Sequence, residues 1–143
     1  MARTFPLAGL LRLRHAEQDR AAATLATAND RVREAADARI AARRTLEDSA
    51  TAMPIEDAAT LSAVAAARAA TRGMLRELDV VAEHRRADAE HAQGEYSAAR
   101  RSALGLEKLE EQHTVAARAE ELRTEQNALD EIAARSRTEG GTR

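Results

Sequence analysis

The sequence predicts an all-α fold, a long antiparallel two-helix coiled-coil hairpin whose C-terminal helix projects beyond it. Three observations favour this fold. The chain is rich in alanine, and charged residues make up 32% of its 143 positions, a composition typical of coiled coils. Apolar and small residues recur with a seven-residue period, and one proline divides this pattern into two runs. With only 1% aromatic residues, the chain cannot build an ordinary globular core.

The first helix is expected over residues 5–51. Thr4 can cap it, and Pro6 suits a first helical turn because its missing N–H has no partner there in any case. Two core positions of the repeat can then be followed along the helix without interruption. They are Thr4, Leu11, Gln18, Leu25, Val32, Arg39 and Leu46 for one, and Leu7, Arg14, Ala21, Ala28, Ala35 and Ala42 for the other.

A turn is expected at residues 52–56, because Pro54 cannot stand in a helix interior. A second helix is expected over residues 57–137, with Pro54 near its first turn and the carboxylates of Glu56 and Asp57 beside its unpaired N–H groups. Its core positions are Leu61, Arg68, Leu75, Ala82, Ala89, Tyr96 and Ala103 for one, and Val64, Thr71, Leu78, Arg85, Ala92, Ala99 and Leu106 for the other.

One antiparallel register aligns the two repeats throughout. It places Val32 near Leu78 and Leu46 near Val64, and it brings Thr4 opposite Leu106. Arginines interrupt the resulting seam at four core positions: Arg14, Arg39, Arg68 and Arg85. Either their stems pack and their charged ends reach water, or they specify the pairing of the helices.

Beyond Leu106, next to Gly105, the repeat is expected to fail, because continuing it would place Glu110 and His113 in the core. The segment 107–137 is therefore expected to project as a single helix that needs a partner. Its exposed apolar stripe would consist of Leu109, Val115, Leu122, Leu129 and Ile132. Residues 138–143, with two glycines, are expected to fray, and the whole chain, 1–143, is expected to form one domain.

A competing geometry folds the chain near its midpoint, at Thr71-Arg72-Gly73, and leaves no overhang. It requires a helix to pass through Pro54.

Several function classes find no support in the sequence. The net charge is -2 and the basic residues are interspersed with acidic ones, so nucleic acid is not an expected partner. No run is long and apolar enough for direct membrane insertion, and the first residues do not resemble a secretory signal. There are 0 cysteines, no glycine-rich phosphate loop and no nucleophile motif, so neither catalytic residues nor a cofactor are expected. His84, Asp88 and His91 share a helix face, but a charged helix produces such spacing by chance, and no metal site is predicted.

Both ends of the chain resemble the flagellar FliJ family, the small coiled-coil component of the flagellar type III export apparatus. The opening residues 5–14, FPLAGLLRLR, resemble the opening of the family. Residues 106–111, LEKLEE, and 125–133, EQNALDEIA, resemble its closing pattern. Length and hairpin layout match over nearly the whole chain.

The resemblance implies a stalk-like coiled coil that is not an enzyme. It implies that the terminal end of the hairpin enters a hexameric flagellar export ATPase, and that the chain also contacts the export gate membrane protein and export chaperones. Such a component of flagellum biogenesis would be cytoplasmic and peripheral at the cytoplasmic side of the cell membrane. The partner-binding residues carried over on this basis are Phe5, Leu7, Leu10, Leu11, Leu109, Leu122, Leu129 and Ile132.

Two other functions remain open at this stage. One is a cytoplasmic coiled-coil scaffold or adaptor that dimerises through its C-terminal helix. The other is a helix protein that lies on a membrane surface, against which the mixed charge argues.

Overall fold

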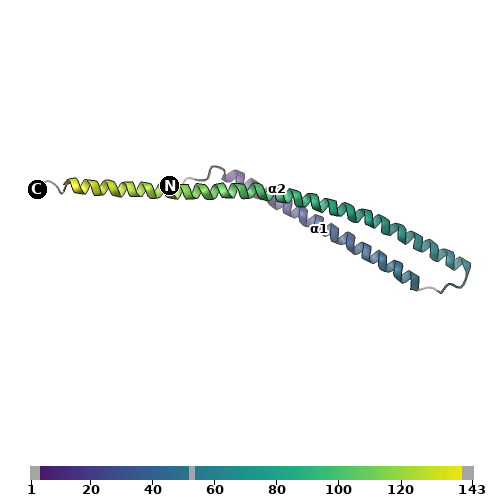
Figure 1. Ribbon diagram of the computed structural model, residues 1–143. Coiled ribbons are helices and arrows are strands. Elements are labelled where there is room, and N and C mark those ends of the chain that lie inside the picture. The colour runs from purple at the N-terminus through teal and green to yellow at the C-terminus, as the bar shows by residue number, and fades with distance from the viewer. Residues whose placement is uncertain (1–3, 52–53, 140–143) are drawn as a thin grey trace. The chain divides into compact units, whose positions relative to one another are not determined.

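The computed structural model describes residues 4–51 and 54–139, and these form two helices that pack against each other. Helix α1 spans Ala8–Thr51 and helix α2 spans Ala58–Glu139 (Figure 1). The described residues contain no strand, which confirms the all-α hairpin. Because α2 runs without a break through Thr71 and Gly73, the alternative fold at the chain's midpoint is wrong.

Helix α1 begins at Ala8 rather than at Phe5, so Thr4 does not cap it. The N–H of Ala8 donates to the carbonyl oxygen of Phe5 over 3.2 Å, and the N–H of Leu11 donates to that of Leu7 over 2.9 Å. The carbonyl oxygen of Leu7 therefore accepts the first α-helical hydrogen bond. A proline keeps the residue before it out of the helical region, which explains why Phe5 stays outside the helix.

Helix α2 begins one residue after Asp57, and Asp57 is its N-cap. The Asp57 carboxylate accepts a hydrogen bond from the N–H of Thr60 over 2.6 Å. Hydrogen bonds from Thr60 hold the pKa of Asp57 below its usual value. Pro54 precedes the helix instead of entering its first turn. Residues 52–53 of the expected turn lie outside the described residues, as do residues 140–143 of the expected tail, and α2 continues two residues past the expected end at 137.

The chain divides into two compact units, Gln18–Ala98 and Met1–Glu17 with Ala99–Arg143. The expectation of a single domain over 1–143 stays a prediction. In Gln18–Ala98, α1 and α2 lie side by side and antiparallel, joined at the turn (Figure 1). In the other unit, the start of α1 packs on the middle of α2, where Ala103 is fully buried.

Most residues of the predicted seam are correct, but three expected core positions at its ends are exposed: Thr4, Leu7 and Leu61. From Leu11 to Leu46, every expected core position of α1 is buried or half-buried, and so is every expected core position of α2 from Val64 to Leu106. The most buried side chains are mostly alanines: Leu11, Ala28, Ala35, Ala42, Val64, Ala82, Ala92 and Ala103. Small side chains at the seam bury little area per turn, so the hairpin depends on its length rather than on a few large contacts.

The register, however, differs from the expected one by one heptad. In Gln18–Ala98, Arg39 forms an ion pair with Asp79 across the helices, with a nitrogen of Arg39 2.6 Å from an oxygen of Asp79. The expected register placed Val32, seven residues before Arg39, at this level, beside Leu78. In the other unit, the ring of Phe5 contacts His113, one heptad beyond the position expected for the start of α1. The sequence pattern could not exclude this difference, because a shift of seven residues leaves every side chain on the same helix face.

The seam also extends further along α2 than predicted. Glu110, His113 and Ala117 are half-buried and continue the heptad pattern past Leu106, so the predicted failure of the repeat is wrong. Gly105 lies inside the helix and does not interrupt it. Because α1 lies one heptad further along α2, its first residues cover positions that were expected to have no partner.

Candidate partner-binding surface

The four expected binding residues at the start of the chain do not form one surface. Leu11 is only 7% exposed and belongs to the core of the hairpin. Phe5 is half-buried, with its ring centroid 5.6 Å from that of His113. Leu7 and Leu10 are exposed and accessible to a partner. Of this group, Leu7 and Leu10 are free to contact a partner, whereas Leu11 and Phe5 hold α1 on α2.

The expected residues on α2 are all exposed. The exposed fractions are 47% for Leu109, 66% for Leu122, 66% for Leu129 and 64% for Ile132. Leu122 and Leu129 are one heptad apart, and Ile132 follows three residues later, so these three share one side of the helix. Leu109 does not join them, because about five and a half helical turns separate it from Leu129 and place it on the opposite side.

Two further exposed residues extend the same side of α2 toward the hairpin. Leu104 and Val115 are 49% and 61% exposed. Leu104 lies about five full turns before Leu122, so the two side chains point in nearly the same direction. We define the α2 stripe by these side chains: Leu104, Val115, Leu122, Leu129 and Ile132. Leu104 was missed by the sequence reasoning, although its 18-residue spacing from Leu122 could have revealed it.

Three residues of the α2 stripe, Leu122, Leu129 and Ile132, lie in a segment with little packing. All described residues from Arg118 to Ile132 are exposed. Large apolar side chains that remain this accessible, one after another along a helix, mark a surface for a partner more often than isolated exposed leucines do. The projection of this segment beyond the hairpin stays a prediction.

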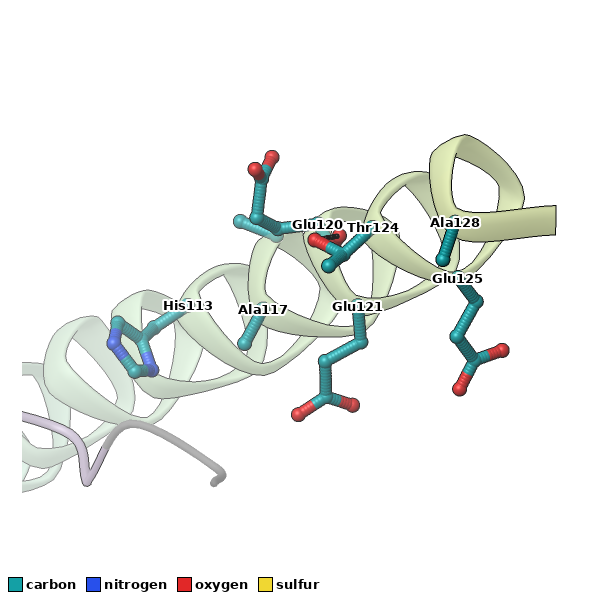
Figure 2. A pocket seen from close by; sticks show the side chains of 8 residues that line it. His113, Ala117, Glu120, Glu121, Thr124, Glu125 and Ala128 are labelled. Atoms are coloured by element: carbon teal, nitrogen blue, oxygen red, sulfur yellow. Dashed lines mark hydrogen bonds between the residues drawn. The ribbon is translucent and has the colours of Figure 1, made fainter. Parts of the chain in front are cut away.

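A second face of this segment carries a shallow groove between His113 and Ala128. Figure 2 shows the side chains that line it, with His113, Ala117 and Glu121 extending from one side of α2. Small residues form its floor, and Glu120, Glu121 and Glu125 provide negative charge. Glu120 lies 4.0 Å from Arg123 on the same helix, a distance at which an exposed pair contributes little.

The start of α1 is attached to α2 by one polar contact in addition to the aromatic one. Nε2 of His15 lies 2.7 Å from a carboxylate oxygen of Glu107. Both side chains are 45% exposed, so the contact orients α1 more than it stabilises the fold. Nearby, Arg14 donates to Glu17 of its own helix over 2.8 Å.

The histidine cluster considered as a metal site is engaged in ordinary helix-surface pairs. Asp88 lies 3.5 Å from Arg85, and His91 lies 3.3 Å from Glu95. Within the described parts of the chain, no group of three or more possible metal ligands gathers. Among these residues, likewise, no helix is long and apolar enough to cross a membrane.

The family model described as "Flagellar FliJ protein" matches residues 3–140 of the chain. The chain belongs to the FliJ family. Membership makes it a coiled-coil protein related to flagellar export, from a family of non-catalytic export components. No match was found among curated proteins or among solved structures.

Proposed function

We propose that this FliJ-family chain binds the hexameric flagellar export ATPase through the α2 stripe and links that ring to the export gate and to export chaperones. In this role the chain hydrolyses no nucleotide itself and acts at the cytoplasmic side of the cell membrane. The observation that carries the proposal is the row of exposed leucine, valine and isoleucine side chains in the terminal part of α2, combined with family membership in flagellar export.

The chemistry of the surface supports a protein partner. A helix with apolar side chains at heptad-like spacing binds by laying that side into a hydrophobic groove. Leu122, Leu129 and Ile132 can each bury most of their exposed surface in such a groove. A single helix hairpin also contacts the subunits of a symmetric ring unequally, and unequal contacts favour different conformations in different subunits.

The binding experiment uses a stripe variant and a matched control. The stripe variant carries Leu122→Ala, Leu129→Ala and Ile132→Ala. The control carries Met74→Ala, Val80→Ala and Val81→Ala, which truncates three other exposed apolar side chains, in Gln18–Ala98. Alanine is the best helix former, so both variants should keep their helicity.

Co-elution with the ATPase and titration of the complex give the result. The stripe variant should bind at least about tenfold more weakly, which corresponds to about 1.4 kcal/mol. The control should bind like the unmodified chain. Equal affinity of all three proteins would show that the α2 stripe is not the binding surface, and failure of the unmodified chain to bind at micromolar concentration would refute the partner.

The heptad spacing of Leu122 and Leu129 favours one other function, a scaffold that dimerises through the end of α2. Sedimentation equilibrium separates the two functions. A dimer that the stripe variant abolishes, without any affinity for the ATPase, would support the scaffold.

A further inference from the structure

The Arg39–Asp79 ion pair is the contact in Gln18–Ala98 that distinguishes the observed register from its neighbour. Arg39 occupies a core position of α1, and Asp79 flanks the seam on α2. Their side chains are 31% and 55% exposed, and a nitrogen of Arg39 lies 2.6 Å from Asp79. In the register that the sequence pattern favoured, Val32 would occupy the position beside Leu78 that Arg39 occupies in the structure.

One of the two core positions of α1 distinguishes the two registers poorly. It holds an alanine in four successive heptads, at Ala21, Ala28, Ala35 and Ala42, so a slip of seven residues exchanges one alanine for another and all side chains keep their faces. The other core position changes residue type, and only the slipped register brings Val32 beside Leu78. Apolar packing therefore does not exclude the slipped register.

The ion pair also leaves one polar group unsatisfied. Nε of Arg39 is buried without a hydrogen-bond partner among the described residues. A buried N–H donor without a partner lowers stability, because it has lost the hydrogen bond that it would make to water in an exposed position.

The turn can accommodate both registers. A slip of one heptad moves α1 by about 10 Å along α2, at 1.5 Å per residue. Because the slip moves the end of α1 toward the start of α2, the connection between Thr51 and Ala58 needs no additional length. The slip must also break the His15–Glu107 contact and the Phe5–His113 contact of the other unit, both of which lie at the surface or half-buried.

We propose that the hairpin is a two-register device, in which the Arg39–Asp79 ion pair holds α1 against a one-heptad slip toward the turn. Breaking this pair shifts the population toward the slipped register. Such a slip transmits a change at one end of α1 along its entire length, because a helix moves as a rigid body over short distances.

Cysteine cross-linking tests the proposal within Gln18–Ala98, and the natural chain has 0 cysteines, so only the introduced pair can react. From the Arg39–Asp79 contact, Leu25 lies opposite Gln93, two heptads along each helix in opposite directions. In the slipped register Gln18 takes the place of Leu25. The two probe pairs are Leu25→Cys with Gln93→Cys, and Gln18→Cys with Gln93→Cys; Arg20→Cys with Gln93→Cys is the exposed control.

With Arg39 and Asp79 intact, the 25/93 pair should form a disulfide under mild oxidation several-fold faster than the 18/93 pair. Adding Asp79→Ala should raise the 18/93 yield several-fold and lower the 25/93 yield, while the 20/93 control stays low. Asp79→Asn, which keeps the size of the side chain, should act in the same direction. Circular dichroism checks that both variants remain helical.

Two results would overturn the proposal. One is an 18/93 yield that stays at the level of the 20/93 control in both Asp79 variants while 25/93 is unchanged, which shows a single fixed register. The other is equal reaction of all three pairs, which shows helices that are not held in any heptad register.

Discussion

The ring of Phe5 packs on the ring of His113, with centroids 5.6 Å apart and planes tilted by 59°. The contact joins the residues before α1 to the middle of α2, and it lies at one end of the seam that α1 covers. A tilted aromatic pair at this distance contributes about 0.5–1.5 kcal/mol beyond the area that it buries. It accounts for the half-burial of His113, which the seven-residue period places at a core position although its side chain is polar.

Replacing Phe5→Ala should loosen the start of α1 without unfolding the hairpin. The free energy of unfolding should fall by about 1 kcal/mol, and amide hydrogen exchange should accelerate over residues 8–17 while it stays unchanged over residues 60–90. Leu13→Ala, at an exposed position of the same segment, is the control and should change neither quantity. Unchanged exchange in Phe5→Ala would mean that this contact does not hold α1 in place.

Leu11 was expected to contact a partner, and the structure places it in the core. Leu11→Ala should therefore lower the free energy of unfolding by about 2 kcal/mol, the lower end of the range for a buried leucine. Chemical denaturation measures the change. An effect below about 0.5 kcal/mol would be the value for an exposed side chain and would contradict the assignment to the core.

The α2 stripe should contribute to binding and not to stability. Because Leu122, Leu129 and Ile132 are about two-thirds exposed, the triple alanine variant should keep its free energy of unfolding within about 0.5 kcal/mol of the unmodified chain. The measurement is chemical denaturation followed by circular dichroism. A large loss of stability would identify the three side chains as structural and would remove the reason to treat them as a binding surface.

Asp57 makes the N-terminus of α2 sensitive to acid. Hydrogen bonds from Thr60 lower the pKa of Asp57 in the folded chain below its ordinary value of 3.8. The carboxylate therefore stabilises the fold at neutral pH, and this contribution is lost as the pH falls through the lowered pKa. Asp57→Ala should lower the melting temperature at pH 7 and have less effect at low pH. Asp57→Asn retains a capping side chain, so it should cost less at pH 7 and lack this pH dependence.

Gly94 lies in the interior of α2, and an added Cβ would meet nothing within 4 Å. Gly94→Ala should therefore stabilise the chain by about 0.5–1 kcal/mol, since alanine loses less conformational freedom than glycine in a helix. Thermal unfolding measures the gain. A loss of stability would indicate that another group packs against this position in solution.

The sequence sufficed to predict which residues form the seam, because the heptad pattern fixes the face of each helix. Ala28, Ala82 and Ala103 were expected in the core and are buried there. The register could not be obtained in the same way, since a slip of one heptad leaves this pattern intact and only polar contacts such as Arg39–Asp79 distinguish the alternatives. The same shift explains why the seam was expected to end at Leu106.

The candidate surface was predicted less well than the fold. Leu122, Leu129 and Ile132 were identified correctly as exposed, because an apolar helix side without a facing helix has nothing to cover it. Leu109 was grouped with them from its residue type, although the helical period places it on the opposite side. Leu11 and Phe5 were expected at a binding surface because the family resemblance placed them there, although the heptad pattern had already put Leu11 at a core position, where the structure has it.

The rate of ATP hydrolysis by the flagellar export ATPase, measured with rising concentrations of this chain, tests the central claim most directly. The account predicts that the unmodified chain stimulates hydrolysis and saturates at the concentration where the two proteins co-elute, and that the triple alanine variant of the α2 stripe requires at least about tenfold more protein. No change in rate and no co-elution, in the presence of a stable ATPase hexamer, would contradict it.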